Sequence, residues 1–377
     1  MKWTVIGQGP SGLLAASFLT LHHERCQVVA AHEGTMSLWS GCFDKGDSEP
    51  ICVLDENRQT MLWELWRQLF WTMGIPMRLG DAYTPTCVGD LKTTYLCPSW
   101  QYSFNDPESL WIVGFDGLPD SFLDVHVPKL QRLTGKDVIW DHLSKPRIWR
   151  EDWGTVRWAS FMETLEGKTW LRESLQLKNA QIPSFWPLLV PQVMGRNSMT
   201  TIQWLTELGN QLGRQVFEYP LVSPSLGGMR IYEAWQIWLK SHGVSFIRGT
   251  VTAYKNGIVQ LEDGRKWNSD HVIMATGGIL GGGINILNTG RIEDSVTHEI
   301  FGNIMDQELR WEEIFRLGFL RQGTVSACGR QRAFWNPDKD RNGGIMILNT
   351  VYQALKEQGL DLLIPEWKGG EIRHVGR

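Results

Sequence analysis

The sequence lacks the features that mark membrane-spanning, nucleic-acid-binding and secreted proteins. None of its apolar runs approaches the length needed to cross a bilayer, so we expect no membrane-spanning helix. A net charge of −4 over 377 residues gives no basic footprint for a nucleic acid. Strand-forming residues begin at Lys2, which leaves no room for a secretory leader. Cytoplasmic residence is therefore the expectation.

Cysteine is too sparse and too scattered to predict a metal centre. The six cysteines form no C-x-x-C motif, and no histidine cluster lies near them at metal-ligand spacing. We therefore expect buried, reduced thiols, and neither zinc nor a protein-borne iron–sulfur cluster. The six are Cys26, Cys42, Cys52, Cys87, Cys97 and Cys328.

What the chain does contain is a glycine pattern at its start. Residues 2–6 are typical of a strand, and Gly7-Gln8-Gly9-Pro10-Ser11-Gly12 has the spacing G-x-G-x-x-G before a predicted helix. Gly7 permits a tight turn, Gly9 lets the backbone approach a pyrophosphate, and Gly12 lets helix and strand pack closely. The helix would point its first N–H groups at the phosphates. This predicts a dinucleotide or flavin site; a glycine turn in another α/β fold is the alternative.

Two further segments extend this prediction. A second strand is expected at residues 26–31, and Glu33 follows it about 20 residues after the last glycine, where a carboxylate can hold a ribose hydroxyl. A solvated glutamate is the alternative. The next loop is rich in small residues and is expected either to run along an isoalloxazine ring or to be an ordinary polar loop. It contributes Ser37, Ser40 and Gly41.

The chain is expected to return to the same site near residue 275. A strand, a hairpin turn at Asn256-Gly257 and a second strand lead to Ala275-Thr276-Gly277-Gly278, whose small residues let the backbone pass close to a cofactor. Strands and helices alternate in the segment between the two glycine motifs. We therefore predict an α/β fold of the two-dinucleotide-binding-domain flavoprotein type, which is a Rossmann-like FAD-binding fold, with an inserted α/β domain.

The predicted domain boundaries follow from this pattern. Residues 1–75 form the first part of the flavin-binding domain, 76–222 the inserted domain, and 223–377 the second part, with a short cap segment near 284–325. Residues 343–345 open a predicted helix whose N–H groups could face the pyrimidine end of a flavin. The predicted cofactor-binding residues are Gly7, Gly9, Pro10, Ser11, Gly12, Glu33, Ser37, Ser40, Gly41, Val251, Ala275, Thr276, Gly277, Gly278, Gly329, Gly343, Gly344 and Ile345.

No acid–base pair stands out among the nine histidines. His126 and His298 are the two to inspect, although a lone histidine is more often structural. Arg230 and Arg291 each follow a glycine-rich loop, and a guanidinium suits an anionic substrate or the flavin N1–C2=O region. Each arginine could equally be a surface or capping residue. The candidate catalytic residues are thus Arg230, Arg291 and His298.

The chain is rich in tryptophan, with 20 residues of this type. Several lie at helix-like spacing, as do Trp63 and Trp66, which is typical of core packing. A partner surface is the alternative interpretation, because tryptophan is enriched among interface anchors.

On these residues the chain resembles the B subunits of anaerobic glycerol-3-phosphate dehydrogenase, a family of the fumarate reductase and succinate dehydrogenase-like flavoproteins. The likeness is distant and runs nearly end to end. It includes the N-terminal glycines, Ser40-Gly41 with Asp44, and residues 111–130. It continues through residues 223–230 and 275–283, and these middle and late blocks are the more family-specific.

The resemblance implies a subunit of a three-part respiratory enzyme that oxidises sn-glycerol 3-phosphate to dihydroxyacetone phosphate and passes electrons to quinone. A sister flavoprotein would perform the substrate chemistry, an iron–sulfur subunit would hold the assembly at the inner membrane, and this chain would relay electrons through a flavin. The family's B subunit is usually assigned FMN, whereas Glu33 suits FAD. Ser40-Gly41 lacks the histidine that anchors FAD covalently in succinate dehydrogenases, so we expect non-covalent FAD, with FMN as the alternative.

Two other functions stay open at this stage. The chain could be a self-sufficient FAD-dependent oxidoreductase of a small acid. It could also be a degenerate flavoprotein kept as a scaffold, with tryptophan-rich surfaces that hold partners.

Overall fold

The computed structural model describes residues 1–46, 54–119, 121–304, 318–319, 321–332 and 343–361, so Cys52 and parts of the predicted cap segment lie outside the described residues. The chain divides into two compact units. The first contains residues 1–36, 44–68 and 235–377, and the second contains residues 37–43 and 69–234. Two of the boundaries fall inside helices, at 68/69 in α2 (Glu56–Thr72) and at 234/235 in α7 (Leu226–Ser241).

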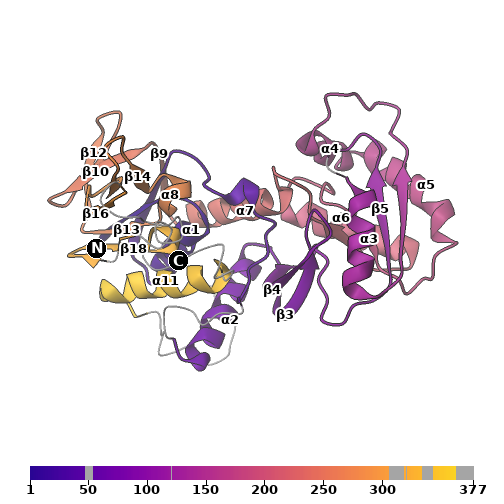
Figure 1. Cartoon of the computed structure of the whole chain (residues 1–377), viewed down its shortest axis with the longest axis horizontal. Helices are drawn as coiled ribbons and strands as arrows, with labels where there is room; N and C mark the ends of the chain where they lie inside the picture. The colour runs from indigo at the N-terminus through magenta and orange to yellow at the C-terminus, as the bar shows by residue number, and fades with distance from the viewer. Residues whose placement is uncertain (47–53, 120, 305–317, 320, 333–342, 362–377) are drawn as a thin grey trace. The chain divides into compact units, whose positions relative to one another are not determined.

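A six-stranded sheet organises the first unit, with the order β17-β18-β13-β1-β2-β9. All neighbours pair in parallel except β17 with β18. Helices α1 and α11 pack against each other beside this sheet (Figure 1). The elements are β1 (Lys2–Ile6), α1 (Pro10–Leu21), β2 (Arg25–Ala30), β9 (Ser245–Arg248), β13 (His271–Met274), β17 (Arg321–Gln322), β18 (Val325–Ala327) and α11 (Gly343–Glu357).

Two small antiparallel sheets complete the first unit. The hairpin predicted at Asn256-Gly257 is confirmed as the turn between β10 and β11, with positive φ at both residues. The two sheets are β10 (Val251–Lys255), β11 (Ile258–Leu261) and β12 (Lys266–Asn268), and β14 (Ile284–Ile286), β15 (Arg291–Asp294) and β16 (Ile300–Asn303). Three short helical turns are η1 (Met36–Leu38), α8 (Gly278–Gly281) and η2 (Gly329–Gln331).

The second unit contains a four-stranded parallel sheet with the order β6-β5-β7-β8 and a separate hairpin of β3 and β4. Every residue of β5 is buried, as expected for a central strand covered on both faces. Helices α3, α5 and α6 flank this sheet in Figure 1. The strands are β3 (Met77–Pro85), β4 (Leu91–Pro98), β5 (Leu110–Phe115), β6 (Val138–Leu143), β7 (Leu188–Pro191) and β8 (Val216–Tyr219), and the helices are α3 (Leu123–Thr134), α4 (Thr155–Met162), α5 (Leu165–Asn179) and α6 (Ser198–Leu212).

Local capping divides one of the predicted helical segments. Residues 159–177 are largely helical, as their pattern predicts, but they belong to two helices, α4 and α5. Thr164 lies between them with extended backbone, and its Oγ1 accepts a hydrogen bond from the Gly167 N–H at 3.0 Å. A side chain that caps a new helix in this way ends the preceding one.

Most of the described tryptophans build the cores. Trp3, Trp63, Trp66, Trp111 and Trp235 are among the fully buried side chains, which supports the packing interpretation. Trp71 and Trp140 are the tryptophans that appear among the exposed large apolar side chains of the described residues.

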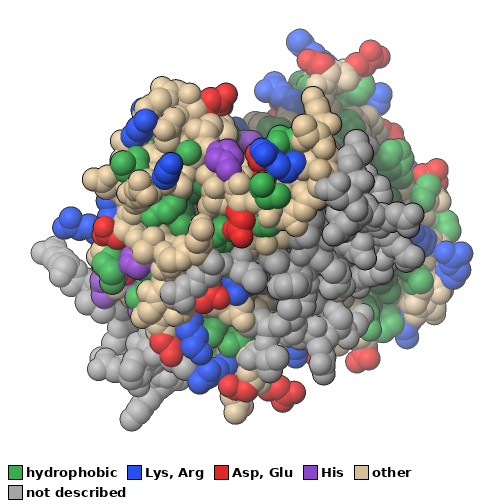
Figure 2. Space-filling view, turned by 60° about the vertical axis from the view of Figure 1, so that its left-hand side comes forward, with side chains coloured by type: hydrophobic (Ala, Val, Ile, Leu, Met, Phe, Trp, Pro, Cys, Tyr) green, Lys and Arg blue, Asp and Glu red, His purple; other side chains and the backbone are tan. Residues whose placement is uncertain are grey.

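In Figure 2, side chains of both charges are scattered over the described part of the visible face, and neither sign covers it. Within the described residues, no helix combines the length and the apolar character that a bilayer crossing requires. No group of three or more possible metal ligands occurs among them.

Candidate functional site

The site predicted from the glycine motifs lies where the order of the first sheet reverses. The chain runs outward from β1 to β2 and β9, and then crosses to the other side of β1 to form β13 and β18. Ligands of such open parallel sheets bind outside the carboxyl ends of the strands at this reversal point. The residues that follow β1 and β13 there are Gly7 and Ala275.

Gly7 and Gly12 have no room for a side chain. Gly7 has φ +111°, and a Cβ there would lie 2.2 Å from the carbonyl oxygen of Ala275. A Cβ on Gly12 would lie 2.1 Å from the carbonyl oxygen of Gly7. Both collisions are with backbone, which cannot move aside cheaply. These two glycines therefore allow β1, α1 and β13 to converge, as the sequence predicts for Gly7 and Gly12.

Gly9 differs, because the space beside it is open. It is the N-cap of α1 with φ −71° and ψ −179°, and a Cβ there would meet no protein atom within 4 Å. Pro10 occupies the first turn, which has no acidic side chain and no side-chain cap. Within the described residues, the N–H groups of Ser11 and Gly12 donate to no acceptor. The start of α1 therefore offers unpaired donors and the positive end of a helix dipole to an anion.

Glu33 lies three residues after Ala30, the last residue of β2, and its side chain is half-buried. The turn that contains Glu33 is held by a hydrogen bond from the Gly34 N–H to Nδ1 of His32 at 3.0 Å. Gly34 has φ +67°, and a Cβ there would lie 3.4 Å from Cα of Gly9. The structure thus places the turn that contains Glu33 against the glycine loop.

Ala275 to Gly278 pass the end of β1. The Ala275 N–H donates to the Ile6 carbonyl at 2.8 Å, and Gly277 and Gly278 have φ +86° and +62°. The Thr276 hydroxyl is buried and has no hydrogen-bond partner in the described part of the chain. A buried polar atom without a partner costs about 1–3 kcal/mol, so this hydroxyl is a candidate ligand contact.

Gly329 converges on the same loop. It has φ +63°, and a Cβ there would lie 2.2 Å from Oγ of Ser11. Its own N–H is taken, since it donates to Oγ1 of Thr350 at 2.8 Å. Gly329 therefore lets the chain pass close to Ser11 because it has no side chain. Its N–H is not free to donate to a ligand.

The start of α11 corrects one prediction. Residues 343–345 were expected to present N–H groups to a flavin, but the Gly344 N–H donates to Oδ1 of Asp44 at 2.7 Å and the Ile345 N–H to the Asp44 carbonyl at 3.0 Å. Gly343 lies against the same carboxylate, since its Cβ would be 3.6 Å from that oxygen. Asp44 caps this helix, so the Gly344 and Ile345 donors are already used.

The loop with Ser37, Ser40 and Gly41 belongs to the second unit. The Ser37 carbonyl accepts a hydrogen bond from the Ser225 N–H at 2.7 Å, and a Cβ on Gly227 would lie 2.3 Å from the Ser40 carbonyl. Gly41 has φ +99°. These contacts show that the loop packs on the start of α7. Val251, in the first unit, is buried in an apolar cluster.

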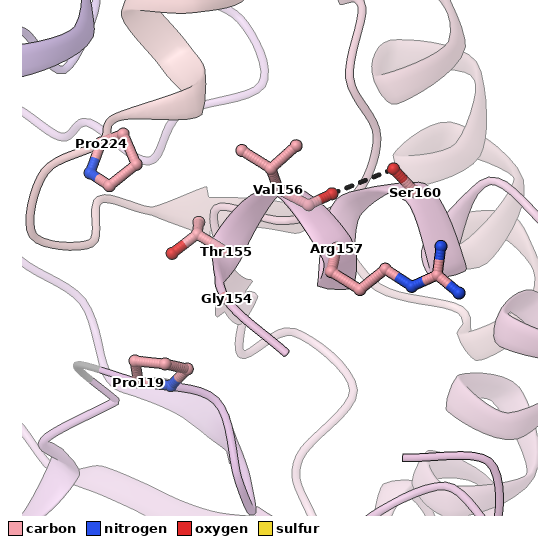
Figure 3. A pocket seen from close by; sticks show the side chains of 7 residues that line it. All are labelled: Pro119, Gly154, Thr155, Val156, Arg157, Ser160 and Pro224. Atoms are coloured by element: carbon pink, nitrogen blue, oxygen red, sulfur yellow. Dashed lines mark hydrogen bonds between the residues drawn. The ribbon is translucent and has the colours of Figure 1, made fainter. Parts of the chain in front are cut away.

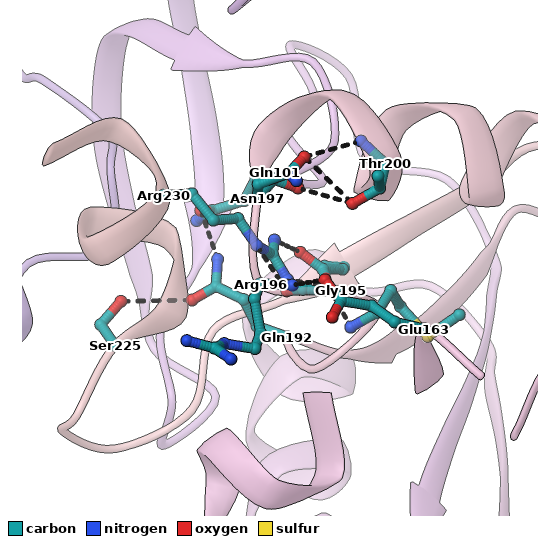
Figure 4. Close-up of polar contacts among 11 residues, drawn as sticks. Gln101, Glu163, Gln192, Gly195, Arg196, Asn197, Thr200, Ser225 and Arg230 are labelled. Carbon is teal, nitrogen blue, oxygen red and sulfur yellow. Dashed lines mark hydrogen bonds and ion pairs between the residues drawn. The ribbon is translucent and has the colours of Figure 1, made fainter. Parts of the chain in front are cut away.

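Arg230 is a buried structural residue, which corrects its assignment as a candidate catalytic residue. Its side chain and that of Glu218 are both 0% exposed and form an ion pair at 2.5 Å. Its Nε and Nη2 also donate to the Gly195 carbonyl at 2.9 and 2.6 Å. Figure 4 shows Arg230 beside Gly195. It also shows a neighbouring pair, Ser225 and Gln192, in which the Ser225 hydroxyl donates to Oε1 of Gln192 at 3.2 Å. A guanidinium engaged in this way is not available to an external anion.

Arg291 and His298 lie together in the first unit, on either side of Glu293. Arg291 Nη2 is 2.6 Å from Oε2 of Glu293, and His298 Nδ1 is 3.5 Å from Oε1. His298 has φ +60°, and its Nε2 lies 3.1 Å from the Thr252 carbonyl. The sequence named both residues but not the carboxylate between them. His126 is buried, and its burial lowers the pKa of the imidazole, as expected of a structural histidine.

A separate cavity of about 540 Å³ lies in the second unit. Figure 3 shows Arg157 pointing away from Thr155, and the Ser160 hydroxyl donates to the Val156 carbonyl at 3.0 Å. None of the predicted cofactor-binding or candidate catalytic residues lines this cavity. The lining residues are Pro119, Gly154, Thr155, Val156, Arg157, Ser160 and Pro224.

The chain was compared with known proteins. No family model matches it, and no curated protein matches it. Among solved structures, it is similar to MibH, a tryptophan 5-halogenase, at 14% identity over 94% of this chain and 66% of that one, with a TM-score of 0.35. It is similar to BrvH, a flavin-dependent halogenase from Brevundimonas sp. BAL3, at 12% identity over 96% and 72% of the two chains, with a TM-score of 0.34.

A third similar structure is L-proline dehydrogenase from P. horikoshii, at 11% identity over 97% and 96% of the two chains, with a TM-score of 0.38. The chain spans slightly less than two thirds of the length of MibH. At these identities and TM-scores, the assignment of a Rossmann-like α/β fold rests on the strand order and on the glycine contacts described above.

Proposed function

We propose that the chain is a flavin-dependent oxidoreductase whose first unit binds FAD without a covalent bond. The observation that supports this most is the convergence of Gly7, Gly9 and Gly12 with Ala275 and Thr276 at the reversal point of a parallel sheet. FAD would supply the redox chemistry, since its isoalloxazine ring accepts and donates electrons.

The residues present fit this cofactor. The open space beside Gly9 and the unpaired N–H groups of Ser11 and Gly12 suit a pyrophosphate. The carboxylate of Glu33 would hold the adenosine ribose, a group that FMN lacks. The buried Thr276 hydroxyl would gain the partner that it lacks within the described residues. These residues favour FAD over FMN.

Within this class we propose an electron-relay subunit of a quinone-linked glycerol-3-phosphate dehydrogenase complex. The support is the sequence resemblance together with the engagement of the candidate catalytic residues. Arg230 is buried in an ion pair, and Arg291 and His298 both face Glu293. Oxidation of a carbinol needs a base within hydrogen-bond reach, and none of these three residues is presented as a free base.

The proposed partners are a sister flavoprotein that oxidises the substrate and an iron–sulfur subunit that places the complex at the inner membrane. We expect the purified chain to bind flavin but not to oxidise glycerol 3-phosphate with an artificial electron acceptor. Co-expressed with those two subunits, it should co-purify in an assembly that does.

Three outcomes of this experiment would contradict the proposal. Turnover by the lone chain would make it a self-sufficient oxidoreductase. A chain that co-purifies with the partners but carries no flavin would be a scaffold. If the chain binds flavin but joins no such complex, the proposal of a flavin-dependent oxidoreductase stands and the proposal of a relay subunit is refuted.

A further inference from the structure

Two cysteines that the sequence presents as unrelated lie side by side in the second unit. The Sγ atoms of Cys42 and Cys97 are 3.0 Å apart, although the two residues are 55 positions apart in the chain. Both side chains are buried, with 1% and 2% exposure. Cys97 is in β4, and Cys42 belongs to the segment 37–43 that packs on this strand.

The backbone pairing of this segment favours a bond between the two sulfur atoms. Phe43 and Leu96 form an antiparallel bridge and exchange two hydrogen bonds, of 2.8 and 3.1 Å. Cys42 and Cys97 are the next opposing residues, and therefore form a non-hydrogen-bonded pair. The Cα atoms of such pairs are about 4.5 Å apart, which lies within the range that a disulfide spans.

Arg78 completes the site on the other side of Cys97. In the β3–β4 hairpin, Arg78 is directly opposite Cys97, so the side chains of Arg78, Cys97 and Cys42 occupy one row across three adjacent strands. Two guanidinium nitrogens donate to the carbonyls of Gln101 and Ser103. Its Nε is buried and donates to no acceptor among the described residues. A cation fixed beside a thiol favours the thiolate.

The two thiols differ in acidity. Burial raises the pKa of Cys42, and its bond to Cys97 raises that pKa further. Burial alone would also raise the pKa of Cys97, but its hydrogen bond with Cys42, the charge of Arg78 and the contact with Ser103 outweigh burial and lower that pKa. Cys97 is accordingly the thiol that more readily forms a thiolate, and the thiolate is the nucleophile.

We propose that Cys42 and Cys97 form a redox-active pair that is converted to a disulfide by a small hydroperoxide. The Cys97 thiolate attacks one peroxide oxygen, an S–O bond forms, the O–O bond breaks, and the second oxygen leaves as water after taking a proton. The Cys42 sulfur then attacks the Cys97 sulfenic acid, and the S–O oxygen leaves as a second water. The two thiols lose two electrons and two protons, and hydrogen peroxide is reduced to two waters.

The burial of both sulfur atoms decides the class of oxidant. A protein disulfide or glutathione disulfide is too large to reach a buried thiol, whereas hydrogen peroxide is close to water in size. The bond would tie residues 37–43 to the β3–β4 hairpin. The proposal does not depend on a bound flavin, so the two proposals can fail separately.

The test is to treat the folded chain with hydrogen peroxide, block the remaining thiols in denaturant, and map the cysteines by mass spectrometry without reduction. We expect one cross-linked peptide pair, Cys42 with Cys97, lighter by two hydrogens and restored to thiols by dithiothreitol. Cys328 is the internal control, because burial raises its pKa to about 12 and no second thiol is adjacent to it among the described residues.

Variants separate the role of Cys97, which attacks the peroxide, from that of Cys42, which attacks the sulfenic acid. In Cys42→Ser, Cys97 should stop at a sulfenic acid that dimedone traps. In Cys97→Ser, Cys42 should stay reduced. Arg78→Met should slow the reaction severalfold, because it removes the cation that lowers the pKa of Cys97 and favours its thiolate. Two results would overturn the proposal: both cysteines remain reduced in peroxide that oxidises free cysteine, or the cross-link involves another cysteine. Because the mapping is done on the wild-type chain, a variant that fails to fold does not affect it.

Discussion

Each unit contains a mainly parallel sheet in which the chain builds strands on one side of the first strand and then crosses to its other side. The residues that lie at this crossing point differ between the two units. In the first unit, β1 lies between β2 and β13, and glycines follow the strands. In the second unit, β5 lies between β6 and β7. There Glu218, in β8, forms a buried ion pair with Arg230 and accepts a hydrogen bond from the Met194 N–H beyond β7.

The difference shows that topology alone does not make a site. A reversal point provides a position where loops diverge, and the residues in these loops decide whether a ligand can enter. Gly9 leaves open space and unpaired donors in the first unit. In the second, Glu218 of β8 and Arg230 of α7 form an ion pair with 0% exposure, and Arg230 also holds the loop after β7 by donating to the Gly195 carbonyl. The first unit is therefore the candidate flavin-binding unit.

Breaking the buried ion pair should have the largest effect. Arg230→Met leaves the Glu218 carboxylate buried without a counter-ion, and we expect it to lower the free energy of unfolding of the second unit by about 3–5 kcal/mol. Chemical denaturation monitored by tryptophan fluorescence measures this. The double variant Arg230→Met with Glu218→Gln removes both charges and keeps an acceptor for the Met194 N–H, so it should recover most of the loss. A single variant as stable as the wild type would refute the structural role of Arg230.

Filling the open space at Gly9 should come next. Gly9→Val places a side chain where no protein atom lies within 4 Å, so the fold should survive while the flavin is excluded. We expect flavin affinity to fall at least about 100-fold, or roughly 2.7 kcal/mol, by fluorescence titration. Gly154→Val is the matched control, because Gly154 is also an extended N-cap with open space beside it, but in the second unit. Equal losses in both variants would show that the effect is not local to the first unit.

Removing the ribose contact should have the smallest effect and decides between two cofactors. If FAD is bound, Glu33→Ala should weaken it about tenfold, since one charge-assisted hydrogen bond is lost. Glu33→Gln retains an oxygen acceptor and should lose less. An FMN-binding chain should respond to neither change. Full affinity for FAD in Glu33→Ala would show that this carboxylate is only solvated.

The sequence predicts most of the first sheet and its glycine loop. The strand before Gly7, the helix after Gly12, the Asn256-Gly257 turn and the strand before Ala275 are all confirmed within a residue or two. These predictions are confirmed because each depends on local conformation. A tight turn, a close approach of two backbones and a positive φ all favour glycine, which the sequence shows directly.

The contacts between distant residues could not be predicted in this way. Arg230 follows a glycine loop, but its role depends on Glu218 and Gly195, and no local pattern identifies a buried counter-ion. In the same way, Asp44 occupies N–H groups of α11 from 300 positions away. Strand β3 has no clear signature in the sequence, because Gly80 and Pro85 are typical of loops. Without β3, the sequence gives no reason to place Arg78 in one row with Cys97 and Cys42.

The central claim is that the first unit is a flavin site, and the visible spectrum of the purified chain tests it most directly. After expression with riboflavin and mild purification, the account predicts absorption bands near those of a bound flavin. Acid precipitation should release the pigment into the supernatant, and chromatography should identify it as FAD. A colourless chain that binds no added FAD would contradict the account, and a pigment identified only as FMN would contradict the role given to Glu33.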